Sequence, residues 1–157
     1  MLQVKRRECL DMSDAEDSKK MKEGQFYVYT LVGHPIPQMR PRFGGGRVWS
    51  AQSKQKFASQ LELAEQHKER PLFDGPVHID AVFYFTPAKS SSKKHKEKLI
   101  DTYHVSKPDI DNLLKYIMDS SSKILFNDDC IVASLRAIKK YSTVEKTVLT
   151  VTQLVRK

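Results

Sequence analysis

Alternating apolar side chains predict four strands in this chain. Phe26 to Val32 alternates aromatic and β-branched residues and stops at a Gly-His-Pro sequence, which is typical of a strand that ends in a turn. Val77 to Phe85 has an apolar residue at every second position, and this predicts a mostly buried strand. Two further strands are expected near the C-terminus, over Cys130 to Tyr141 and Lys146 to Val155.

Helical periodicity predicts two helices between these strands. The first begins at a capping serine, Ser50 or Ser53, and ends near His67. The apolar residues that share one of its faces are Phe57, Leu61 and Ala64. The second helix spans Asp111 to about Ser121. Its inward stripe consists of Leu113, Leu114, Ile117 and Met118.

Two basic segments complete the pattern. Gln38 to Ser50 predicts an exposed hairpin that turns at three consecutive glycines, 44 to 46. Pro87 to Lys107 is rich in Ser and Lys and predicts a mobile basic loop. With the strands and helices, these segments indicate an α+β fold, a mixed, mostly antiparallel sheet with two helices packed on it.

The 157 residues are enough for one domain with its own core. Residues 1–24 are polar and lack periodicity, so they cannot bury enough apolar surface to offset the entropy of ordering. We therefore expect a disordered N-terminal tail over residues 1–24 and a folded domain over residues 25–157.

The net charge of +8 favours a polyanionic partner. Residues 1–24 contain six basic and six acidic side chains, which leaves 21 basic and 13 acidic ones in residues 25–157. A basic folded domain is the electrostatic footprint of nucleic acid. The two cysteines do not make a disulfide framework, and no apolar run suits a secretory signal or a membrane span. An intracellular location, cytoplasmic or nucleoid-associated and without a membrane partner, is expected.

Acidic residues gather at one place in this basic chain. The sequence Lys107-Pro108-Asp109-Ile110-Asp111-Asn112-Leu113-Leu114-Lys115 is followed, one helix length later, by Asp128-Asp129. Two carboxylates within about 4 Å repel by about 4 kcal/mol at an effective dielectric constant near 20. Such a cluster implies a shared proton or a compensating cation, and a divalent metal is the obvious candidate.

The chain is long enough to bring Asp129 back to Asp109 and Asp111. The second helix is about 16 Å long at 1.5 Å per residue, and the segment from Ser122 to Asp129 can extend about 23 Å. Strand alternation places Asp129, rather than Asp128, on the side predicted to face the core. Lys115 lies one helical turn beyond Asp111 and could neutralise charge on a scissile phosphate.

Structural roles also account for each acidic residue taken singly. Asp109 and Asp111 could be helix N-terminal anions, worth about 0.3 to 1 kcal/mol each. Asp111, Lys115 and Asp119 could form a solvated ion-pair ladder, and the acidic pair could be an ordinary turn. A calcium loop is excluded because its required glycine and glutamate positions hold Leu114 and Ser120. The histidines without ligand spacing, to which no role is given, are His34, His78, His95 and His104.

These residues together resemble the RusA family of Holliday junction resolvases, which are small metal-dependent endodeoxyribonucleases. The resemblance runs from about Phe26 to Val155. Its elements are Arg40-Pro41-Arg42 after a Pro-rich entry, a strand ending in Phe83-Tyr84-Phe85, the basic loop, the long Lys-Pro-Asp motif and the acidic pair. The chain departs from similar sequences at Lys123, where they usually have Gly, and at Ile131, where they usually have Gln.

The resemblance implies which residues act and what they act on. The catalytic carboxylates and metal ligands would be Asp109, Asp111 and Asp129, with Lys115 as the essential lysine and Mg²⁺ or Mn²⁺ as the cofactor. The enzyme would be a homodimer that makes paired nicks in a four-way DNA junction. The apolar positions most available for a dimer contact lie on the expected edge strands, which include Phe26 to Val32 and Val148 to Leu154.

Basic and aromatic side chains outside the motif are candidates for DNA contact. The predicted phosphate contacts are Arg40, Arg42, Arg47, Lys93, Lys94, Lys96 and Lys107. Phe43 or Trp49 could wedge against bases at a branch point, although packing of the hairpin explains Trp49 better. Two other functions remain open: a non-catalytic DNA- or RNA-binding protein, and a metal-dependent nuclease that cuts flaps or other branched DNA.

Overall fold

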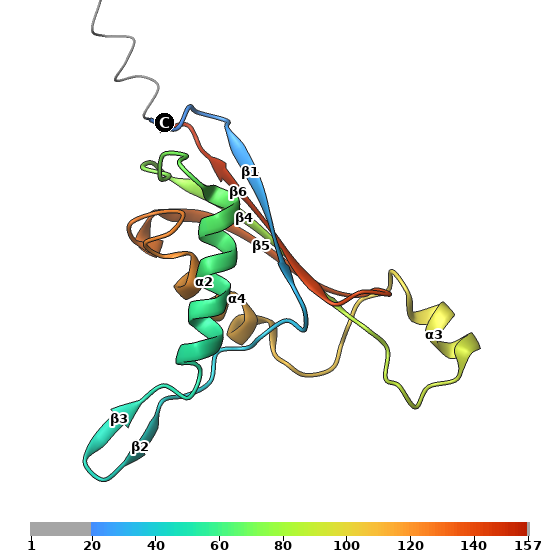
Figure 1. Cartoon of the computed structure of the whole chain (residues 1–157). Coiled ribbons are helices and arrows are strands. Elements are labelled where there is room, and N and C mark those ends of the chain that lie inside the picture. The colour runs from blue at the N-terminus through green and yellow to red at the C-terminus, as the bar shows by residue number, and fades with distance from the viewer. Residues whose placement is uncertain (1–19, 157) are drawn as a thin grey trace, which may run out of the picture.

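A four-stranded sheet forms the centre of the computed structural model, which describes residues 20–156 (Figure 1). Its strands are β1 (Phe26–Val32), β4 (Val77–Phe85), β5 (Val132–Tyr141) and β6 (Lys146–Gln153). They lie in the order β1-β6-β4-β5. The β4–β5 pair is parallel, and the β1–β6 and β4–β6 pairs are antiparallel. The predicted α+β fold with a mixed, mostly antiparallel sheet is confirmed.

Helices α2 (Ser53–His67) and α4 (Ile110–Ser121) cover one face of the sheet and contact each other (Figure 1). Leu113 and Ile117 of α4 are buried, and Leu114 and Met118 pack partly buried against the core, as the predicted inward stripe requires. Between the helices and the sheet lie the fully buried side chains of Tyr29, Leu63, Phe83, Phe126, Leu149 and Val151.

The predicted inner face of α2 is wrong. Phe57 and Leu61 are 62% and 54% exposed. The buried residues are Ser59, Leu63 and His67. Two of these are polar, but each has a buried partner: the Ser59 hydroxyl bonds the hydroxyl of Tyr116 at 3.0 Å, and Nδ1 of His67 bonds the hydroxyl of Tyr29 at 2.8 Å. These bonds lower the cost of burying the Ser59 hydroxyl and one ring nitrogen of His67, although Nε2 of His67 is buried without a partner.

The predicted serine cap of α2 is also wrong. Ser53 is the first helical residue, and the residue before it, Gln52, occupies the cap position without a side-chain capping bond. The Gln52 side chain is instead bonded to the preceding loop.

The segment Pro87 to Lys107, predicted as a mobile loop, contains a third helix. Helix α3 (Lys93–Leu99) is capped by Ser92, whose side chain accepts a hydrogen bond from the backbone N–H of His95 at 3.3 Å. Lys and Glu are good helix formers, so a capped run of them forms a short helix. It stands away from the sheet (Figure 1).

The hairpin is present as predicted and projects from the body of the protein (Figure 1). Strands β2 (Arg42–Gly44) and β3 (Arg47–Trp49) are antiparallel and exposed. Gly45 and Gly46 have φ values of 57° and 75°, which glycine adopts without strain.

The prediction that residues 148–154 form an edge strand is wrong. Residues 148–154 belong largely to β6, which lies between β1 and β4 and is not an edge strand. The proposed tail, residues 1–24, lies mostly outside the described residues. Within the described part, Met21 is buried in the core and the backbone N–H of Gly24 donates to Gln153, so ordered contacts begin before residue 25.

Lys123 follows the end of α4 with a φ of 67°. This left-handed conformation favours glycine over lysine. Across residues 20–156, no helix has both the length and the apolar character needed to cross a membrane.

Candidate active site

The N-terminus of α4 brings the first two predicted carboxylates together. Asp109 is the residue before the helix, and its carbonyl oxygen accepts the first helical hydrogen bond, from Leu113 at 3.2 Å. Asp111 lies in the first turn. Both are exposed and line one open cavity of about 520 Å³. Carboxylates are stabilised there by the unpaired N–H groups and positive dipole end of the helix.

A strap formed by residues 101–108 leads into this helix along the outer edge of β5. The backbone N–H of His104 donates to the carbonyl of Lys139 at 3.0 Å, and Tyr103 pairs with Lys140. The ammonium of Lys139 donates to the carbonyl oxygens of Ser106 and Pro108 at 2.6 and 2.7 Å. These bonds fix the backbone directly before Asp109.

His104 anchors the strap to the sheet. Its ring is buried and stacks on Phe85, with ring centroids 4.2 Å apart, and packs against Tyr141 at 4.8 Å. Burial and the neighbouring Lys139 lower the pKa of His104 below its ordinary value, which keeps the imidazole neutral. Both His104 and Lys139 line the cavity that holds Asp109 and Asp111.

No role for either residue could be predicted from the sequence. Pairing of the strap with β5 joins segments that are distant in the chain, and no local pattern signals it.

Asp129 does not lie in a strand, so the alternation argument that selected it rested on a wrong premise. It begins the short helix η1 (Asp129–Ile131), three residues before β5. The side chains of Ala133 and Leu135, which have the same strand parity as Asp129 and should therefore face the core with it, are exposed. Helix η1 nevertheless contacts α4.

Asp128 has a structural role next to Asp129. Its carboxylate accepts a hydrogen bond from the backbone N–H of Cys130 at 2.9 Å and caps η1. This bond holds the pKa of Asp128 below its ordinary value. The acidic pair is thus divided into a capping residue, Asp128, and a second exposed carboxylate, Asp129.

The three predicted metal ligands are not gathered into one group. Among residues 20–156, no three His, Cys, Asp or Glu side chains are close enough together to hold an ion. Asp109 and Asp111 do share a cavity. Magnesium is usually held by one or two carboxylates together with substrate phosphates and water, so this pair has the donor chemistry that Mg²⁺ or Mn²⁺ requires.

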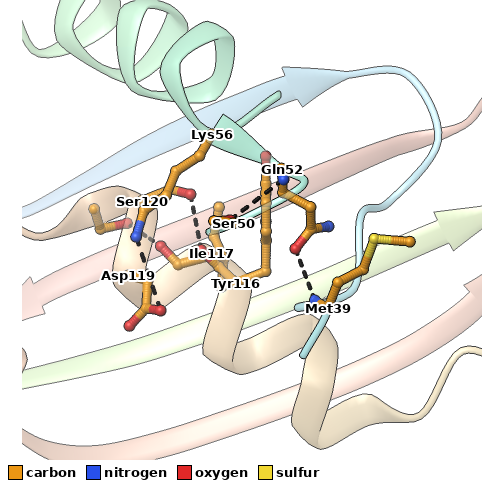
Figure 2. A network of polar contacts seen from close by, with 9 residues as sticks. Met39, Ser50, Gln52, Lys56, Tyr116, Ile117, Asp119 and Ser120 are labelled. Carbon is orange, nitrogen blue, oxygen red and sulfur yellow. Dashed lines mark hydrogen bonds and ion pairs between the residues drawn. The ribbon is translucent and has the colours of Figure 1, made fainter. Parts of the chain in front are cut away.

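Lys115 is exposed one turn after Asp111 on α4. The ion-pair ladder that could have explained it is not formed, because Asp119 pairs with Lys56 of α2 at 3.8 Å (Figure 2). None of the ion pairs found in the described part of the chain includes Lys115. Its ammonium is therefore available to a ligand.

A buried glutamine holds the base of the basic hairpin. The side chain of Gln52, only 4% exposed, accepts a hydrogen bond from the backbone N–H of Met39 at 2.7 Å (Figure 2). It also donates to the carbonyl of Pro37 at 2.7 Å. The neighbouring Gln38 donates its backbone N–H to the carbonyl of Asn112 in α4 at 2.8 Å. The hairpin is thereby tied to α2 and to the start of α4.

Predicted DNA contacts lie on both sides of the carboxylate pair. Arginines 40, 42 and 47 are exposed on or next to the hairpin, and Lys93 and Lys94 are exposed on α3. The ammonium of Lys96 already donates one hydrogen bond, to the carbonyl of Lys89 at 3.0 Å. Lys107, in the strap, is exposed. In Figure 1 the start of α4 lies between the two projections.

The two hairpin aromatics differ in their surroundings. Phe43 is 78% exposed. The Trp49 ring lies over Gly44, where an added Cβ atom would come within 2.9 Å of it. Trp49 therefore packs within the hairpin, which leaves Phe43 as the more accessible aromatic side chain.

Comparison with known proteins identifies relatives of this chain. Residues 33–152 match the family described as Endodeoxyribonuclease RusA. The uncharacterized protein YqaN of Bacillus subtilis (strain 168) is 34% identical over 123 residues, which cover 73% of this chain and 87% of that protein. The match to the family includes the carboxylate pair, Lys115, the hairpin and α3.

Proposed function

The chain belongs to the RusA family of endodeoxyribonucleases, and from this premise we propose that it is a structure-selective, metal-dependent endonuclease. Its proposed substrate is a four-way DNA junction, which it resolves by paired symmetric nicks. The observation that carries this proposal is the exposed pair Asp109 and Asp111, which shares a cavity at the start of α4 between two basic projections. A protein that only bound nucleic acid would gain nothing from carboxylates there, because they repel phosphate.

The proposed cofactor is Mg²⁺ or Mn²⁺, with Asp109 and Asp111 as its principal ligands. Asp129 is proposed as the third carboxylate, since η1 contacts the helix that carries Asp111. When bound there, a divalent cation would supply Lewis-acid activation of the attacking water. The carboxylates would hold this ion, and the bonds from Lys139 would keep the backbone before Asp109 in place.

Lys115 is proposed to stabilise charge that builds on the phosphate during cleavage. It is exposed, it forms none of the ion pairs found in the described residues, and it lies one turn from Asp111. A fixed cation aimed at developing charge lowers the barrier without needing to rearrange. The arginines of the hairpin and the lysines of α3 would hold the flanking backbone through phosphate contacts.

We further propose that the working unit is a homodimer. Resolution of a junction requires cuts in two strands of like polarity, and a two-fold dimer supplies two equivalent sites. β1 is an edge strand with exposed Phe26, Val28 and Val32, and it is the remaining candidate for the contact now that β6 is known to be central. Sedimentation should give about twice the chain mass of 18.1 kDa. Mixed dimers with one Asp111→Asn subunit should nick one strand only.

Cleavage of synthetic DNA tests the function directly. The purified chain is incubated with Mg²⁺ and labelled four-way, three-way and linear duplex DNA of matched sequence. We expect symmetric nicks in the four-way junction and little cutting of the linear duplex. Binding without cutting at any divalent metal concentration would contradict the nuclease and favour the DNA-binding alternative, whereas preferred cutting of forks or flaps would contradict junction resolution.

A further inference from the structure

The strap beside the carboxylate pair presents two apolar side chains to solvent. Tyr103 is 68% exposed and Val105 is 87% exposed. The residue between them, His104, points inward and is 9% exposed, which is the alternation of a strand. Tyr103 also lines the cavity that contains Asp109 and Asp111.

The exposure of these side chains is not a consequence of a loose segment. The backbone around Tyr103 is bonded to β5 on both sides: Tyr141 donates to the carbonyl of Thr102 at 2.9 Å, and His104 donates to that of Lys139 at 3.0 Å. The stacked ring of His104 and the ammonium of Lys139 fix the strap further. Tyr103 is thus held at a defined place next to the carboxylates.

We propose that Tyr103, backed by Val105, is a stacking surface for an unpaired base next to the scissile phosphate. The proposal rests on the nuclease function proposed above, because it assumes that this phosphate lies at the metal ion proposed for Asp109 and Asp111. The base of the neighbouring nucleotide is then within reach of an aromatic ring on the same cavity wall. Lys107 lies on the same strap, is exposed and supplies positive charge for the adjoining backbone.

Stacking on Tyr103 would contribute to the choice of substrate. A base inside an intact duplex is already stacked, and freeing it costs a few kcal/mol. At a branch point a base is more easily unstacked, so only branched DNA offers the ring a partner at low cost. The contact is tolerant of sequence because every base has an aromatic face. Tyr103 would therefore select structure rather than a particular base.

The test combines protein variants with DNA from which single bases have been removed. Binding of full-length wild type, Tyr103→Ala and Tyr103→Phe to a four-way junction is measured in EDTA, so that no cleavage is needed. In a series of junctions, one abasic nucleotide is placed in turn at each position around the branch. Phe57→Ala is the matched control, because Phe57 is a similarly exposed aromatic residue, at 62%, on α2.

At one or two positions, loss of the base should weaken wild-type binding about 5- to 100-fold, the range that stacking of one base provides. Tyr103→Ala should bind the intact junction more weakly by a similar factor and should be insensitive to the abasic site. Tyr103→Phe and Phe57→Ala should behave as wild type. The proposal is wrong if the loss of affinity caused by Tyr103→Ala and the loss caused by the abasic nucleotide multiply at every position. It is also wrong if no abasic position weakens binding by the wild type.

The same variants separate this proposal from the nuclease itself. If wild type binds junctions but never cuts them, the proposed function fails while the binding data still decide the role of Tyr103. If wild type cuts junctions and the Tyr103→Ala variant has an unchanged rate and unchanged affinity, the stacking proposal fails and the nuclease stands.

Discussion

The ammonium of Lys139 donates a hydrogen bond of 2.7 Å to the carbonyl oxygen of Pro108, the residue directly before Asp109. A second bond, of 2.6 Å, goes to Ser106. A side chain on an edge strand of the sheet thereby fixes the backbone from which the first carboxylate projects. The two carboxylates proposed to bind the metal therefore depend on Lys139, which is distant from them in the sequence and has no other role in the proposed chemistry.

Lys139→Met should lower the rate of cleavage at saturating DNA far more than it lowers affinity. Misplacement of a reacting group by about 1 Å can cost about 100-fold in rate, and the variant loses both bonds that hold the segment. Lys139→Arg should restore much of the rate, because a guanidinium can also donate to two carbonyls. Lys140→Met is the control. A loss confined to affinity would make Lys139 a DNA contact rather than a positioning residue.

Lys115→Ala should likewise reduce the rate at saturating DNA with little change in affinity. The proposed interaction forms with charge that develops only in the transition state, so its loss appears in the chemical step. Single-turnover cleavage and binding, measured on the same junction, separate the two quantities. Weaker binding with an unchanged rate would show that Lys115 only holds the DNA backbone.

Much of the fold could be predicted from the sequence, because alternation and turn residues can be recognised within short stretches of the chain. The bounds of β1 and β4 were predicted correctly, since each strand alternates and ends at turn residues. The inner face of α2 was not, because Ser59 and His67 are buried only by virtue of hydroxyl partners on other elements. Periodicity reports which side chains are apolar, and it cannot report which polar ones find a partner.

In the candidate site, too, only the residues that are close together in the sequence could be predicted to lie together. Asp109 and Asp111 are two residues apart at a helix start, so the sequence alone could predict that they lie together. The prediction that Asp129 joins them depended on the path of the segment that follows α4, and the prediction that Asp129 lies in a strand was wrong. Lys139 and His104 reach the cavity only through the pairing of the strap with β5, which no spacing in the sequence indicates.

Stability should fall as the pH is lowered from 7 toward 5, in part because of His67. Burial, followed by the charge of Arg70, lowers the pKa of His67 below its ordinary value of 6.5. Below pH 6.5 the unfolded chain therefore binds more protons than the folded one, and the free energy of unfolding decreases. His67→Asn should show a smaller difference between pH 7 and pH 5. Thermal unfolding at both pH values measures this.

The control for His67 is His95→Gln, because His95 is exposed on α3. It should leave the pH dependence unchanged. An equally steep loss of stability in the His67→Asn variant would exclude His67 as a cause.

The basic projections should determine how strongly affinity depends on salt. Each phosphate contact contributes about 0.9 to the slope of log affinity against log salt. Replacing Lys93, Lys94 and Lys96 with Gln should therefore reduce the slope by about 2 to 3, with the lower value if Lys96 keeps its bond to Lys89. Lys22→Gln with Arg156→Gln, both exposed near the far end of β1 and β6, should change it little. An unchanged slope in the triple variant would mean that α3 does not face DNA.

The two members of the acidic pair should differ in their effect on cleavage. Asp109→Asn, Asp111→Asn and Asp129→Asn should each reduce cleavage by more than the roughly 100-fold that loss of an outer partner of a metal ligand costs. Binding in EDTA should be unchanged or stronger, because each variant removes a charge that repels phosphate. Asp128→Asn should retain most activity, since an asparagine oxygen can still accept the bond from Cys130 that caps η1. Cleavage at the wild-type rate by Asp129→Asn would show that the site needs no third carboxylate. Asp109 and Asp111, which line the same cavity, would then hold the ion together with the substrate phosphate.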